Sequence, residues 1–175
     1  DSLEKIRWIS MNISSYNNNL LSSDINIFYD QNSKDNKKEI WNFQLDTTNG
    51  NNINIVYNFF TKEYDILVQD SENIIYLIDK NGNLKWKKSI GEKIIGKISY
   101  LDYYKNNKYQ FLFNTSSKLF LVDRLGRNVK DYPFKIEGET NLQHSLFDYD
   151  NNKDYRIIIA NSKGKIFNYK KNGNR

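Results

Sequence analysis

The sequence of 175 residues contains no cysteine and only one histidine. The absence of cysteine excludes disulfides, thiolate metal sites and thiol nucleophiles. The single histidine, His144, excludes a site built from several imidazoles unless carboxylates complete it. Its neighbour Ser145 does not make a serine–histidine pair easily, because successive residues of a strand point to opposite faces. We therefore expect His144 at the surface or at a strand edge.

The chain also lacks any apolar run of about eighteen residues, the length of a membrane-spanning helix, so we expect no transmembrane segment. No signal peptide is recognisable. The chain begins at Asp1 without methionine and ends inside a repeated motif. We therefore expect it to be a piece of a longer protein.

Residues that favour strands are abundant: the chain has 13 Tyr, 10 Phe and 3 Trp, with frequent isoleucine. The formal net charge is +5, but the lysines are spread out and interleaved with acids. The densest basic patch is Lys85, Lys87 and Lys88 around Trp86. Nucleic-acid surfaces gather basic residues on one face, whereas scattered lysines keep edge strands soluble. We therefore expect no nucleic-acid partner.

The chain repeats itself. Three stretches each contain an apolar strand that runs into a tight turn closed by glycine: 74–83, 118–127 and 165–174. The glycines, Gly82, Gly126 and Gly173, lie 44 and 47 residues apart. The preceding segments 99–110 and 145–156 align at an offset of 46. Since Trp41 and Trp86 are 45 apart, the tail of a further unit precedes these.

Each repeat is interpreted as four strands. The first clear unit predicts strands at 53–60, 65–69, 74–79 and 84–89. The second predicts strands at 94–102, 110–114, 118–123 and 133–136. The third predicts 142–148, 156–160 and 165–169. The second strand of every unit is a continuous apolar run, as expected for a strand buried on both faces.

Four strands in about 45 residues form the blade of a β-propeller, which needs neighbouring blades to bury its faces. The fold class is therefore all-β, a propeller of four-stranded antiparallel blades. A β-sandwich would not explain the regular offset. The approximate units are 1–50 (partial and irregular), 51–92, 93–138 and 139–175 (truncated). We expect about three blades and part of a fourth, which form an arc of a larger propeller; the alternative is a small closed ring.

The stretch 76–86 resembles the repeat of the quinoprotein-like (PQQ-type) propeller families. Their pattern is an aromatic, an aliphatic, an Asp, a turn with Gly, and then Trp; Asp79, Gly82 and Trp86 match it in place. Propeller lipoproteins of outer-membrane assembly carry the same repeat, and residues 40–175 look like large bacterial propeller-repeat proteins of uncharacterised function. The second copy has Leu125 in place of Asn81 and no Trp after its glycine. The adjacent cysteines of quinone-dependent dehydrogenases are absent, so the resemblance implies neither PQQ nor dehydrogenase activity.

The repeated turn residues have structural interpretations. Glycine permits the positive φ of a hairpin turn at three positions: Gly82, Gly126 and Gly173. Asp79 and Asp123 can accept backbone N–H bonds across their turns. We expect Trp41 and Trp86 to pack between blades, with each indole N–H bonded to a carbonyl.

The sharpest chemical candidate is the loop with Asp148, Asp150, Asn152 and Asp154, because oxygens at alternate positions can wrap Ca²⁺. It is similar to the calcium loops of integrin-type propellers. Those loops have glycine and an acid where this chain has Lys153 and Arg156, which would repel a cation. The alternative is an Asx-rich turn without metal.

No spacing singles out a pair of carboxylates of the kind that glycosidases use, and no glycine-rich phosphate loop occurs. We expect no catalysis and no cofactor other than this calcium candidate. The sequence favours a scaffold that binds protein partners, as a subunit of a larger complex in the bacterial periplasm or cell envelope, with the cytoplasm as the alternative compartment. The alternative function is a calcium-dependent or carbohydrate-binding or carbohydrate-processing propeller.

Overall fold

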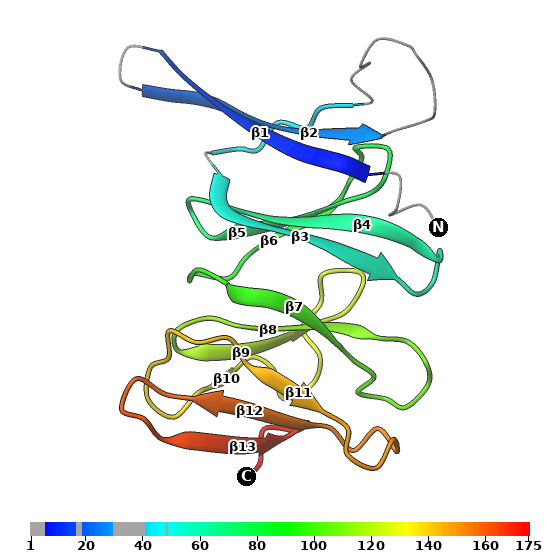
Figure 1. Ribbon diagram of the computed structural model, residues 1–175, viewed down its shortest axis with the longest axis vertical. Helices are drawn as coiled ribbons and strands as arrows, with labels where there is room; N and C mark the ends of the chain where they lie inside the picture. The colour runs from blue at the N-terminus through cyan, green and yellow to red at the C-terminus, as the bar shows by residue number, and fades with distance from the viewer. Residues whose placement is uncertain (1–5, 17–18, 30–40, 48) are drawn as a thin grey trace.

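The structure is a computed structural model that describes residues 6–16, 19–29, 41–47 and 49–175. Within these ranges the chain is all-β, and thirteen strands form four antiparallel sheets (Figure 1). None of the described residues belongs to a helix that could traverse a bilayer.

The first sheet is a hairpin of two long strands, β1 (Ile6–Tyr16) and β2 (Asn19–Tyr29). They pair antiparallel, with Tyr16 opposite Asn19 at the turn end. This hairpin lies in the part of the chain, residues 1–50, that the sequence predicts to be a partial, irregular unit.

The next two sheets have four strands each. Sheet I consists of β3 (Asn49–Asn58), β4 (Glu63–Asp70), β5 (Ile74–Ile78) and β6 (Leu84–Ser89). Sheet II consists of β7 (Ile95–Leu101), β8 (Gln110–Asn114), β9 (Lys118–Val122) and β10 (Phe134–Lys135). Every strand pairs with its neighbour in the chain, so each sheet is a simple meander.

The last sheet, sheet III, has three described strands: β11 (Ser145–Phe147), β12 (Arg156–Ala160) and β13 (Ile166–Lys170). Figure 1 shows the sheets following one another in chain order, from the hairpin at one end to β13 at the other. Each strand predicted from the three repeats has a counterpart within a few residues of the predicted bounds, so that prediction is confirmed.

The sheets pack face to face, with apolar side chains on both faces of the inner strands. Leu67 and Ile75 of sheet I share a buried cluster with Phe113 and Phe120 of sheet II. Their chain neighbours point to the opposite face of sheet I and form a second buried cluster with Leu45: Ile66, Val68, Tyr76 and Ile78. A further cluster joins sheets II and III. Continuous apolar runs therefore arise because these strands are buried on both faces.

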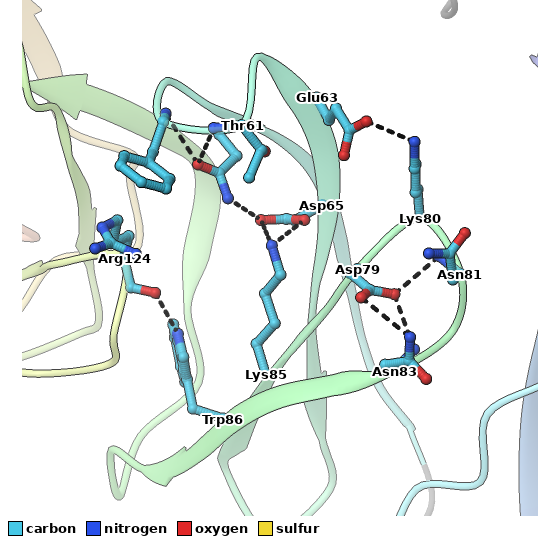
Figure 2. Close-up of polar contacts among 12 residues, drawn as sticks. Thr61, Glu63, Asp65, Asp79, Lys80, Asn81, Asn83, Lys85, Trp86 and Arg124 are labelled. Carbon is cyan, nitrogen blue, oxygen red and sulfur yellow. Dashed lines mark hydrogen bonds and ion pairs between the residues drawn. The ribbon is translucent and has the colours of Figure 1, made fainter.

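A tryptophan of one sheet also contacts a turn of the next. The Trp86 indole Nε1 donates to the carbonyl of Arg124 at 3.0 Å, in the β9–β10 turn (Figure 2). Trp41 makes the equivalent contact with the Lys80 carbonyl, at 2.8 Å. The turns that receive the indoles begin with Asp79 and Asp123, whose carboxylates each accept two backbone N–H groups. These aspartates hold the turns in the shape that the indoles meet.

Glycine is required in these turns for two reasons. Gly82 and Gly126 have φ values of +83° and +80°, which side-chain-bearing residues rarely adopt. A Cβ at either position would lie 2.8 Å from the ring of Trp41 or Trp86, respectively. The glycines thus leave room for the indole of the preceding unit as well as closing the turn.

Between sheets II and III two aromatic residues share the role of the missing tryptophan. Phe134 lies against Gly173, 3.0 Å from where a Cβ would be. The Tyr132 hydroxyl donates to the Lys171 carbonyl at 2.8 Å, the position equivalent to Lys80. The Phe134 ring supplies the packing and the Tyr132 hydroxyl supplies the hydrogen bond. At the other junctions a single indole supplies both.

Two glycines with nearly the same backbone allow the indole contact to be tested. Gly91 has φ of +76° and no atom within 4 Å of the point that a Cβ would occupy, whereas Gly126 meets Trp86. We expect Gly126→Ala to lower the free energy of unfolding by about 2 kcal/mol more than Gly91→Ala, because only the former pushes against a packed ring. Urea denaturation measures both values; equal losses would contradict a tight indole contact.

Candidate functional site

The loop proposed for calcium is organised by hydrogen bonds within the protein. The Asp148 carboxylate accepts the backbone N–H groups of Asn152 and Lys153, and the Asn152 side-chain oxygen accepts the N–H of Asp154. In the described part of the chain, no three His, Asp or Glu side chains are grouped closely enough to hold a metal ion. The structure therefore does not bring the carboxylates of Asp148, Asp150 and Asp154 together around one point.

Lys153 of this loop connects sheet III to sheet II. Its Nζ lies 2.6 Å from Oδ2 of buried Asp102 and 2.5 Å from Oδ1 of Asn107, both in the equivalent loop one repeat earlier. Burial raises the pKa of Asp102, but the hydrogen bonds from Lys153 and from backbone N–H groups outweigh it and hold this pKa below its usual value. The lysine that takes the place of a calcium-loop glycine thus forms an ion pair between sheets.

His144 is buried, with 2% of its surface exposed, so the expectation of a surface position is wrong, although the residue directly precedes the edge strand β11. Its Nδ1 lies 3.0 Å from Asn114 Oδ1 and its Nε2 2.9 Å from Ser99 Oγ. Its backbone N–H also donates to Asn114. These hydrogen bonds satisfy the ring inside the protein, which removes the cost that unpaired polar atoms would carry there.

The Ser99–His144–Asn114 arrangement has the order of a nucleophile, base and orienting group, from residues that are not adjacent in the sequence. Catalysis also requires a substrate to reach the hydroxyl and imidazole. The burial of His144 places it in the junction between sheets II and III instead. We therefore interpret the network as structural.

The junction between sheets I and II contains a buried amide at the equivalent place. Gln69 accepts the N–H of Ile94 at 2.9 Å and donates to the Glu92 carbonyl at 2.9 Å. Asn114, which lies at the same position of the next unit, accepts the N–H of His144 and donates to the Leu142 carbonyl. Each amide thus ties the chain entering the next sheet to the end of an inner strand.

The basic patch around Trp86 is engaged within the protein. Lys85 forms an ion pair with the buried carboxylate of Asp65 at 2.7 Å (Figure 2), and Lys87 pairs with Asp46. Lys88 donates to the carbonyl of Gly126. Its three ammonium groups therefore do not form a free cationic surface.

An open cleft of about 540 Å³ lies between sheets I and II, at the end that carries the β3–β4, β7–β8 and β9–β10 connections. Its walls come from three segments far apart in the sequence: the end of β3 with the following turn (57–60), the β7–β8 loop with the start of β8 (104 and 106–111), and the β9–β10 turn (123–125 and 127). Aromatic side chains, charged groups and a cavity coincide at this site.

Aromatic rings form one side of the cleft. Phe59 stacks on Tyr109 with ring centroids 4.2 Å apart, and Tyr57 meets Phe59 edge to face at 4.9 Å. Phe60 is 70% exposed, and the Arg124 guanidinium lies over its ring at 4.5 Å from the centroid. The position of Arg124 is fixed by the Trp86 indole, which holds its carbonyl, so the repeat contact also builds the cleft.

Sequence reasoning missed this cleft because its three walls come from different turns. The available signal was Phe59–Phe60, two consecutive aromatics, but the predicted strand 53–60 included both, so they were not recognised as exposed. Neither the repeat pattern nor the spacing of acids points to these residues.

Comparison with known proteins identifies no family: no family model and no curated protein matches the chain. Among solved structures, the chain is similar to a protein of unknown function from Bacteroides caccae, with 12% sequence identity and a TM-score of 0.42. The match covers 87% of this chain and 54% of that protein. The chain thus spans about half the length of this neighbour.

The buried histidine makes the stability depend on pH. Burial lowers the pKa of His144 to about 4, so the unfolded chain, with a pKa near 6.5, binds the proton more readily. Stability from this group is fully present above about pH 6.5 and declines as the pH falls towards 4. Between pH 7 and 5 we expect the unfolding free energy to drop by about 2 kcal/mol more in the wild type than in His144→Gln. Identical pH profiles in urea denaturation would contradict the assignment.

Proposed function

We propose that the chain is part of a β-propeller and acts as a non-catalytic scaffold that binds a protein partner within a larger complex. Support for the propeller comes from successive meanders that stack face to face and share one tryptophan-to-turn contact. Such stacked units bury a continuous core only with their neighbours.

The PQQ-type repeat family is part of this proposal. Support comes from the contacts of its three matching residues: Asp79 caps the turn, Gly82 makes room for an indole, and Trp86 carries the same contact to the next turn. A place in a bacterial periplasm or envelope assembly stays a prediction.

The observation that carries the binding role is the cleft between sheets I and II. It gathers exposed Phe60, Tyr104 and Leu125 with half-exposed Phe59 around one hollow. Contiguous exposed apolar side chains on a soluble domain mark interaction sites, and aromatic and arginine residues are enriched at the centres of protein interfaces. Of the alternative functions, the exposed rings also favour carbohydrate binding, whereas the hydrogen-bonded Asp148 loop gives no support to calcium dependence.

Photo-crosslinking at the cleft tests the proposal. We expect Phe60→benzoylphenylalanine to crosslink a protein in cells that express the chain naturally, because this side chain faces the proposed partner. Tyr149 offers a matched control, since it is an aromatic residue of a turn region with 71% exposure but lies outside the cleft.

The crosslinked products are separated by electrophoresis and identified by mass spectrometry. A discrete protein product at position 60 that is absent at position 149 agrees with a partner at the cleft. The same products at both positions, or none at position 60, would contradict it.

A further inference from the structure

The amide oxygens and the carboxylate that line the cleft are already engaged inside the protein. Asn58 accepts the N–H groups of Phe60 and Thr61, and Asp123 pairs with Arg127. The other amides also have partners within the protein: Asn106, Asn107 and Gln110. A ligand that donates hydrogen bonds to amide and carboxylate oxygens of the protein, as a sugar hydroxyl does, finds these oxygens occupied.

The charges left free in the cleft are positive. Arg124 and Lys108 line it, and neither forms an ion pair with any residue of the described ranges. Asp123 is the one carboxylate among its lining residues, and it is neutralised by Arg127 at 2.7 Å. An anionic group entering the cleft therefore meets cations without a competing acid.

The ring faces are partly covered. One face of Phe59 is stacked on Tyr109, and Arg124 lies over Phe60. A sugar ring binds to an open aromatic face, so these contacts compete with it. An apolar side chain needs only edges and partial faces, such as the exposed parts of Phe60, Tyr104 and Leu125.

We infer that the cleft binds an acidic segment of a partner protein, with a bulky apolar side chain in the hollow and neighbouring carboxylates on Arg124 and Lys108. This inference rests on the proposed scaffold function and specifies the chemistry of its partner. The apolar side chain displaces water from the aromatic wall, and the carboxylates bind the two free cations.

Three labelled synthetic peptides test the inference by fluorescence anisotropy with the full chain. The acidic probe alternates Glu and Asp with Phe and Leu. The second probe replaces every acid by Lys, and the third replaces Phe and Leu by Ser while keeping the acids. We expect the acidic apolar probe to bind at least tenfold more tightly than either of the others, and to weaken as salt screens the charges.

Variants of the chain locate the binding site. Arg124→Gln and Lys108→Gln each remove a free cation, and we expect about tenfold weaker binding of the acidic probe from Arg124→Gln. The backbone carbonyl of Arg124 still accepts the Trp86 indole, so unchanged Trp fluorescence and thermal melting show that the fold is kept. Lys163→Gln is the control, because Lys163 is an exposed cation outside the cleft, and we expect no change.

The outcomes separate this inference from the function on which it rests. Equal binding of the acidic and lysine probes, no binding of the acidic probe up to about 1 mM, or unchanged binding by both cation variants would overturn the acidic-segment inference. Preferential binding of an oligogalacturonate probe over the acidic peptide would overturn it in favour of a glycan. If Phe60→benzoylphenylalanine nevertheless crosslinks a discrete protein, the scaffold function stands and only the partner chemistry is wrong.

Discussion

The structure depends on the contact between a tryptophan of one sheet and a glycine turn of the next. A sheet with apolar residues on both faces must be covered twice, and shape alone would let neighbouring sheets slide. The indole of Trp86 prevents this because it must both fit over Gly126 and donate to the Arg124 carbonyl. A packing requirement and a directional hydrogen bond together fix how the β9–β10 turn lies against sheet I.

At each of the two junctions between sheets I, II and III, a buried amide fixes the end that lies opposite the aromatic contact with the turn. Gln69 and Asn114 lie at the ends of β4 and β8 that are remote from the cleft, and each binds the chain that enters the next sheet. With both ends held, the apolar clusters between the sheets fill a space of defined width. The cleft is then left at the turn end, where the loops diverge and their aromatic side chains are not fully covered.

The sequence was sufficient for the elements but not for the site. The repeat of Gly82, Gly126 and Gly173 predicts the turns and strands because these depend on local backbone requirements. The burial of His144 could not be predicted, because it depends on Ser99 and Asn114 from the preceding sheet. The cleft could not be predicted for the same reason, because the turns that form it become neighbours only when sheets I and II stack.

The junction between sheets II and III shows that the same contact can be made by two residues instead of one. Phe134 supplies the ring and Tyr132 the hydrogen bond that a single indole supplies elsewhere. Exchanging one arrangement for the other takes more than one substitution. After the first substitution alone, the junction lacks either the ring that packs on the glycine or the hydrogen-bond donor. Repeats joined in this way are expected to diverge by coupled substitutions, and a search that counts tryptophans will miss units whose architecture is intact.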